Sequence, residues 1–220
     1  MYSMKDMRFD SFVDFLVYLE ENGIMCSKIE DLIKIQYFNE FGGGQKLLTI
    51  YKEFSDGKNR YNRKHKDDTK AKRLIALYEF ELSLEDETFP LIQQMEMEQE
   101  ILGYTQVIMP IDKRFVFVQD INTTYAPRVE VYCLANAKTE SMKIDRRTFG
   151  SKPIELHDIL LLKKWKSKPQ IKYVNGKYEP VCGNPFHKST CKGCAEADGC
   201  SMKEWWIDDY DIRNDIKTNT

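Results

Sequence analysis

The sequence lacks any run of about 18 consecutive apolar residues, the length at which a helix becomes a candidate for spanning a membrane, so we expect no transmembrane segment. Residues 1–10 carry charges where a signal peptide would need an apolar core. These two absences predict a cytoplasmic protein. Thiols stay reduced in that compartment, so the 6 cysteines are expected to be free or to bind metal rather than to form disulfides.

An excess of charge of either sign is also missing. Lys and Arg together number 33 and Asp and Glu 35, which leaves a formal net charge of -2 over 220 residues. This balance excludes a protein that coats nucleic acid through bulk positive charge, so any such contact must be a local patch. With 42% hydrophobic and 12% aromatic residues, the composition also excludes a disordered chain, a collagen-like chain and a coiled coil over the whole length.

Residues 1–56 carry the pattern of a small helical unit. Apolar residues at helical spacing follow Ser11, a typical N-cap residue, and comprise Phe12, Val13, Phe15, Leu16 and Leu19. Residues 27–30 (SKIE) have the spacing of a capping box and predict a second helix. A third helix is expected from about residue 45 to 54, after a turn rich in glycine. The pattern therefore predicts a tight helical hairpin.

The segment 57–106 changes character, and we expect a charged linker followed by a connecting helix. Up to residue 73 its only acids are Asp67 and Asp68, against Lys58, Arg60, Arg63, Lys64, Lys66, Lys70, Lys72 and Arg73. Two interpretations stay open: a solvated flexible loop, or a loop that contacts phosphates, since clustered cations release counterions from a nucleic-acid backbone. The second part is acidic, and its apolar spacing predicts a helix that ends at Gly103. We interpret its acidic side as a solvated face.

From about residue 107 the hydrophobic pattern alternates with a period of two. Strands are expected at 115–118, 128–134, 142–145 and 158–165, and residues 170–181 predict a hairpin around the type I′ turn Asn175-Gly176. Short strands at this spacing suit a closed barrel, and the five-stranded OB barrel is the economical choice. The predicted fold class is α+β: a helix–hairpin–helix unit (1–56), the connecting segment (57–106), and an OB-type β-barrel with a C-terminal tail (107–220).

A cysteine cluster occupies residues 182–200 and looks like an insertion into the barrel region. Its members are Cys182, Cys191, Cys194 and Cys200, with His187 among them. The CKGC sequence at 191–194 has the spacing of a metal knuckle, and four thiolates match tetrahedral zinc. The small polar residues between the cysteines build no core, so a metal would be needed to order them.

We therefore predict a structural zinc ion held by these four cysteines. Three alternatives stay open: a [4Fe–4S] cluster, reduced free cysteines in a loop, and His187 in place of Cys182 as a ligand. Cys26 and Cys133 lie in apolar contexts and are expected to be core residues.

Cations and aromatics alternate in and after the fourth predicted strand. They are Lys163, Lys164, Trp165, Lys166, Lys168, Lys172 and Tyr173. OB barrels hold single strands with a basic groove and stacking aromatics, so we predict a nucleic-acid contact here, with Tyr125 and Arg128 as further candidates. The alternative is that Trp165 is a core residue and that the lysines keep an edge strand soluble.

The glycine-rich turn is a second candidate contact. A helix–hairpin–helix offers backbone N–H groups and a helix N-terminus to a phosphate. Gly42, Gly43 and Gly44 would permit that close approach. The alternative is that the turn only packs its two helices together.

Four stretches in sequence order resemble the C-terminal region of the bacterial DNA polymerase III alpha subunit, a C-family replicative polymerase. They are residues 8–15 (RFDSFVDF), 32–42 (LIKIQYFNEFG), 97–104 (MEQEILGY) and 204–211 (EWWIDDYD). Residues 125–132 and 158–160 also resemble the OB domain of that family. The resemblance implies a helix–hairpin–helix that grips duplex DNA and a barrel that holds single-stranded template during replication.

The family's palm, whose acidic residues hold two magnesium ions, has no counterpart in this sequence, and there is no Walker loop. We therefore expect a non-catalytic, DNA-binding part of such a polymerase. The partners that the resemblance implies are primer–template and single-stranded DNA, the catalytic portion of the polymerase and a sliding clamp, although we assign no clamp-binding segment. The alternative is a free-standing, phage-type interaction protein that binds a polymerase or a sliding clamp.

Overall fold

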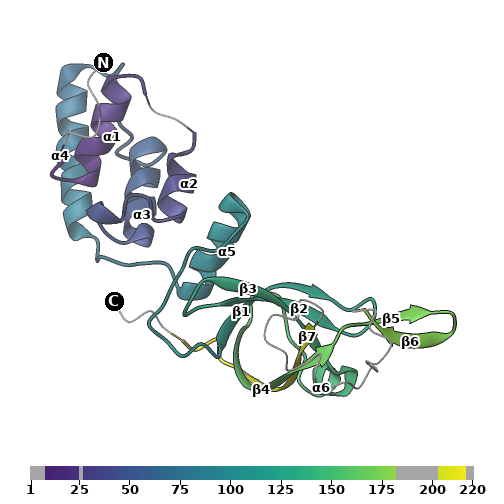
Figure 1. Cartoon of the computed structure of the whole chain (residues 1–220). Helices are drawn as coiled ribbons and strands as arrows, with labels where there is room; N and C mark the ends of the chain where they lie inside the picture. Colours follow the sequence, from purple (N-terminus) through teal and green to yellow (C-terminus); the bar gives the residue numbers. More distant parts are fainter. Residues whose placement is uncertain (1–7, 25–26, 182–202, 217–220) are drawn as a thin grey trace. The chain divides into compact units, whose positions relative to one another are not determined.

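The computed structural model describes residues 8–24, 27–181 and 203–216, and the chain divides into two compact units, 1–104 and 105–220 (Figure 1). The described elements of the first unit are helices, whereas the second is built mainly of strands, so the fold is of the α+β class, as predicted. No described helix combines the length and the apolarity that crossing a bilayer requires.

The first two helices differ in how well their starts were predicted. Helix α1 spans Phe12–Glu21, and the hydroxyl of its N-cap Ser11 accepts the N–H of Asp14 at 3.0 Å, which confirms the predicted cap. Helix α2 spans Ile29–Lys34, but its N-cap is Lys28 and makes no side-chain cap hydrogen bond. The capping-box prediction is therefore wrong: the cap lies one residue after Ser27, which puts the glutamate one position too early in the first turn.

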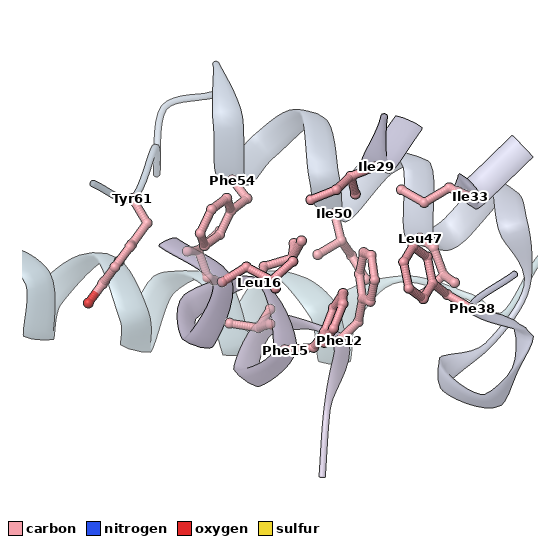
Figure 2. Packing of buried hydrophobic residues seen from close by; sticks show 13 residues of the cluster. Phe12, Phe15, Leu16, Ile29, Ile33, Phe38, Leu47, Ile50, Phe54 and Tyr61 are labelled. Atoms are coloured by element: carbon pink, nitrogen blue, oxygen red, sulfur yellow. The ribbon is translucent and has the colours of Figure 1, made fainter. Parts of the chain in front are cut away.

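A short 3-10 helix, η2 (Asn39–Phe41), leads to helix α3 (Gly44–Ser55). Figure 2 shows the aromatic-rich cluster that these helices enclose. Its buried members are Phe12, Val13, Phe15, Leu16, Leu19, Ile29, Ile33, Phe38, Leu47, Ile50, Phe54, Tyr61 and Leu77. Each buried large apolar side chain contributes about 1.5–3 kcal/mol relative to exposure, so this cluster holds the unit together.

Helices α4 (Asp67–Ser83) and α5 (Leu91–Leu102) complete the first unit. The flexible loop that the sequence predicts up to residue 73 ends earlier, because α4 already begins at Asp67. The carboxylates of Asp67 and Asp68 lie in the first turn of α4, where the helix dipole favours them, and Leu77 is fully buried in the cluster. Helix α5 ends at Gly103 in the left-handed conformation (φ 79°), as predicted.

The sequence pattern predicts that the acidic side of these two helices is a solvated face, but two of its glutamates are buried. Glu81 is 8% exposed and accepts the backbone N–H of Phe12 at 3.0 Å, at the start of α1. Glu98 is 5% exposed and accepts a hydrogen bond from Gln94 at 2.9 Å. Both carboxylates satisfy donors that would otherwise be buried without a partner, which a charge pattern alone does not indicate.

The second unit contains a closed five-stranded barrel. Its strands are β1 (Phe115–Asn122), β2 (Arg128–Cys133), β3 (Lys138–Ile144), β4 (Ile159–Pro169) and β7 (Lys203–Ile212), joined in the order β1-β2-β3-β7-β4. Strands β3 and β7 pair in parallel, and the other neighbours pair antiparallel. The short helix α6 (Arg146–Ser151) lies between β3 and β4 in the chain (Figure 1).

The barrel interior is largely aliphatic. Its buried members are Val116, Val118, Val129, Val131, Met142, Ile144, Ile154, Leu160, Leu162, Ile207 and Tyr210. The hydroxyl of Tyr210 donates to the carbonyl of Lys152, and burial together with the charge of Asp158 raises the pKa of this tyrosine to about 12.

The hairpin that we expected as part of the barrel is a separate two-stranded sheet, β5 (Ile171–Val174) with β6 (Lys177–Pro180). Its turn is of the predicted kind, because Asn175 (φ 49°) and Gly176 (φ 79°) both have positive φ. The fifth barrel strand is instead β7, which we had assigned to the tail. That strand brings two fully buried side chains, Ile207 and Tyr210, to the core, and this burial explains why it closes the barrel.

Candidate nucleic-acid interface

The pairing of β4 with β7 decides which tryptophans face the barrel interior. Trp165 lies opposite Ile207, and Ser167 lies opposite Trp205. Residues opposite each other in a ladder point to the same side, and Ile207 is fully buried, so both tryptophans lie on the inner side. Two irregularities between Leu162 and Trp165 shift the register here. The strands therefore bring two large rings to one end of the barrel interior.

These rings line a cavity of about 210 Å³. Its walls consist of Lys113, Val116, Val131, Cys133, Asn136, Lys138, Glu140, Met142, Leu162, Trp165 and Trp205. Trp165 remains 42% exposed, so its ring is accessible to a ligand. Small-molecule pockets usually measure roughly 300–1,000 Å³, so this one is sized for a single ring system rather than for an extended molecule.

Cys133 is one of these lining residues. It is only partly buried, and its Sγ lies 3.4 Å from the carbonyl oxygen of Lys113. It packs against the edge of the barrel core, which is a less enclosed position than the core residue that we expected.

The third tryptophan lies on the outer side of the same strands. The Nζ atom of Lys168 lies 3.7 Å from the centroid of the Trp206 ring, and that of Lys143 lies 5.5 Å away. The indole N–H donates to Glu204 at 2.8 Å. Burial of the Lys168 ammonium, aided by the nearby charge of Lys166, lowers the pKa of Lys168. Trp206 is thus a fixed aromatic surface with cations above it.

Two lysines of β4 are paired with acids of β7. Lys163 contacts Asp211 at 2.5 Å, and Lys166 contacts Asp208 at 2.8 Å. The hydrogen bond to Asp211 raises the pKa of the Lys163 ammonium. Lys164 is exposed, and no ion pair joins it to an acid in the part of the chain that the structure describes. The face therefore combines aromatics with charges of both signs, so it is less basic than the run of lysines in the sequence suggests.

The other predicted contacts of this unit are dispersed. Tyr125 is 80% exposed in the loop between β1 and β2, and its carbonyl accepts a hydrogen bond from Arg146 at 3.2 Å. Arg128 is the exposed first residue of β2. Lys172 and Tyr173 lie on the separate β5–β6 sheet, where Tyr173 is 65% exposed.

Sequence reasoning missed the contribution of β7. It assigned Trp205 and Trp206 to a tail and so left both out of the candidate site, together with Lys143 on the neighbouring strand. The signal that could have found them is the run Trp205-Trp206-Ile207, since aromatic and β-branched residues favour a strand.

The glycine-rich turn gives its N–H groups to its own chain. The N–H of Gly43 donates to Asp86 at 2.6 Å, and those of Gln45 and Lys46 donate to the carbonyl of Glu87 at 3.1 and 3.3 Å. A Cβ on Gly43 would lie 2.2 Å from that carbonyl oxygen. The glycines thus admit residues 86–89 of this protein, and two of the donors predicted for a phosphate, the N–H groups of Gly42 and Gly43, already have acceptors.

The predicted zinc ligands Cys182, Cys191, Cys194 and Cys200, with His187, lie outside the described residues, as does Cys26. Within ranges 8–24, 27–181 and 203–216, no three His, Cys, Asp or Glu side chains are grouped so that they could hold a metal ion. The zinc ion and the alternative [4Fe–4S] cluster therefore stay predictions from cysteine spacing.

A larger hollow, of about 650 Å³, lies in the first unit. Its lining mixes both signs of charge with apolar rings and comprises Arg8, Phe9, Asp10, Ser11, Glu40, Phe41, Lys46, Tyr78, Glu81 and Leu82. Tyr78, whose pKa is raised to about 12 by burial and by its hydrogen bond to Asp14, stays neutral there at physiological pH. This mixed lining favours no particular class of ligand, and volume alone does not identify the hollow as a binding site.

Comparison with known proteins returned no matching family model, no matching curated protein and no matching solved structure.

Proposed function

We propose that the barrel unit binds single-stranded nucleic acid and does so without catalysing a reaction. The observation that carries this proposal is the cavity in which Trp165 and Trp205 face one opening. Aromatic side chains stack on bases of any sequence, and each stacked base contributes about 1–3 kcal/mol. A cavity with room for one ring, walled by two indoles, suits an unstacked base.

The topology supports an OB-type barrel. Strand β1 pairs with both β2 and β4, and β7 runs parallel to β3 between β3 and β4. This is the arrangement of a five-stranded barrel of the kind that binds oligonucleotides on its surface. The exposed Tyr125 lies in the β1–β2 loop, which in such barrels contributes to the binding surface.

Stacking, more than charge, is expected to supply the affinity of the barrel. Because Lys163 and Lys166 already pair with acids, they release few counterions when a strand binds. The cations that remain for phosphates are Lys164 and Lys168, the latter above Trp206. We therefore expect barrel binding to depend only weakly on salt.

The resemblance to the polymerase III alpha subunit gives this activity a setting: a template-holding part whose chemistry resides in a separate catalytic portion during DNA replication. The proposal does not extend to a duplex grip by the glycine-rich turn, since Asp86 and Glu87 accept its N–H groups. The proposal keeps a structural zinc ion on the cysteines at 182–200, because their number and spacing match tetrahedral zinc.

The test is fluorescence anisotropy with a labelled single strand. Trp165→Ala is expected to weaken binding by about 5- to 150-fold, the equivalent of one lost stacked base. Tyr37→Ala, which removes a still more exposed ring from the first unit, is the control and should leave the affinity unchanged.

Intrinsic tryptophan fluorescence supplies a second readout, because all 3 tryptophans lie in the barrel unit. A folded Trp165→Ala protein that bound the strand as tightly as the parent would refute the proposed site. Extension of a primer by the purified protein alone would refute a non-catalytic role.

A further inference from the structure

The loop that joins α3 to α4 is firmly anchored, although its sequence is polar. The ring of Tyr61 packs on Phe54 with centroids 5.7 Å apart, and Figure 2 shows the two side by side at one end of the cluster. The Tyr61 hydroxyl donates to Glu21 at 2.7 Å, and its backbone N–H donates to the carbonyl of Phe54 at 3.0 Å. A single buried side chain therefore fixes the middle of the loop.

The backbone on either side of Tyr61 is held by acids of the neighbouring helices. The N–H of Asn59 donates to Glu53 at 2.8 Å, and the N–H of Arg63 donates to Glu20 at 3.2 Å. Glu21 also pairs with Lys70 at 2.8 Å, and hydrogen bonds from Lys70 and Tyr61 lower its pKa. These carboxylates are thus engaged with the loop backbone, with Tyr61 and with a lysine outside the loop.

Four of the loop cations, in contrast, are exposed and form no ion pair with an acid of the described residues. Residues 57–66 contain no Asp or Glu. Lys58, Arg60, Lys64 and Lys66 are exposed, and within the described residues no ion pair joins any of them to a carboxylate. The flanking Asp67 and Asp68 belong to the first turn of α4, where the helix N-terminus already favours negative charge.

We propose that this loop, residues 57–66, binds the phosphate backbone of nucleic acid as a second contact that acts independently of the barrel. An anchored loop presents its cations in a fixed array, so little ordering entropy is lost when phosphates bind. The large ring of Tyr61 is buried and His65 is only partly exposed, so the loop offers exposed cations to a backbone rather than an exposed ring to bases. Binding is therefore indifferent to sequence, and it applies to duplex as well as to single strands.

A membrane surface fits the same loop less well. Interfacial segments insert apolar side chains beside their cations, and the apolar body of Tyr61 is committed to the protein core. A regular row of phosphates also gives the counterion release that makes unpaired, clustered cations effective.

The test compares two variants of the full chain that lose the same charge. Lys64→Gln combined with Lys66→Gln removes two loop cations, whereas Lys28→Gln combined with Lys34→Gln removes two lysines that pair with Asp31 and Glu30 on α2. Affinity for a blunt duplex is measured between about 50 and 200 mM salt. Each lost phosphate contact should reduce the log–log salt slope by about 0.9, so the loop variant should lose about 1.8 and the α2 variant should match the parent.

The barrel variant Trp165→Ala separates this inference from the proposed function. It should keep the parent salt slope for duplex while losing affinity for single strands. An equal slope for the loop variant and the parent would overturn the inference even if the barrel binds single strands. Preferential binding of the loop to anionic vesicles, or equal competition by polyglutamate, would also overturn it.

Discussion

The two units of this protein use aromatic side chains and charges in opposite ways. In the helical unit, five rings are buried in the cluster, Phe12, Phe15, Phe38, Phe54 and Tyr61, while loop cations stand without acidic partners. In the barrel, the core is largely aliphatic and the tryptophans are only partly covered, while the surrounding lysines pair with aspartates.

If the chain binds nucleic acid as we propose, this contrast separates two modes of contact. A surface with charge and no accessible ring can hold a phosphate backbone but cannot distinguish bases. A surface with rings and neutralised charge can hold an unstacked base with little dependence on salt. The comparison therefore fits our proposals of backbone binding by the helical unit and base stacking by the barrel.

The largest expected effect tests whether the aromatic cluster stabilises only the unit that contains it. Phe12→Ala removes a fully buried ring and should lower the free energy of unfolding of the helical unit by about 3–5 kcal/mol. The helical circular dichroism signal follows that unit, while tryptophan fluorescence follows the barrel, because the helical unit contains no tryptophan. We expect the first midpoint to fall and the second to stay; an equal fall in both would show that the two units unfold as one.

A smaller effect is expected at the glycine-rich turn. Gly43 has φ −67°, which any residue adopts, so Gly43→Ala would act only through the overlap of its Cβ with Glu87. We expect a loss of about 1–3 kcal/mol in the helical unit.

Gly150→Ala in α6 of the barrel unit is the matched control, because a Cβ there meets nothing within 4 Å. It should stabilise the barrel by up to about 1 kcal/mol, since alanine favours a helix. If Gly43→Ala behaved like this control in a denaturant titration, the close approach of residues 86–89 would not matter for stability.

The smallest effect concerns the charge contrast itself. Asp208→Asn frees Lys166 from its exposed ion pair, at a stability cost below about 1 kcal/mol. The salt slope for a single strand should become steeper by about 0.7, the value of one additional phosphate contact. Asp215→Asn, which frees Arg213 beyond the end of β7, is the control. A steeper slope for this control alone would contradict the idea that the β4–β7 face follows a strand.

Local signals in the sequence predicted much of the fold. Ser11 as a cap, Gly103 as a stop and the positive-φ pair Asn175-Gly176 each depend on a few adjacent residues, and the structure confirms all three. What failed depends on distant residues. Glu81 is buried because it accepts the N–H of Phe12, a partner 69 positions away that no charge pattern indicates.

The candidate site shows the same limit. The sequence identified Trp165 and its neighbouring lysines, because cations and aromatics alternate within one strand. It did not identify Trp205, which reaches the same cavity only because β7 pairs with β4. Nor could it indicate that Lys166 meets Asp208, since that pairing is set by the register between two strands separated by the β5–β6 hairpin.

The position of β7 in the barrel also bears on how the chain is made. Strand β7 fills the gap between β3 and β4, yet it is the last barrel strand to leave the ribosome. At translation speeds of about 5–20 residues per second, the interval between β4 and β7 lasts a few seconds. During that interval β3 and β4 present unpaired edges, the kind of surface that recruits other strands and chaperones. The helical unit, complete by residue 104, has no such waiting period.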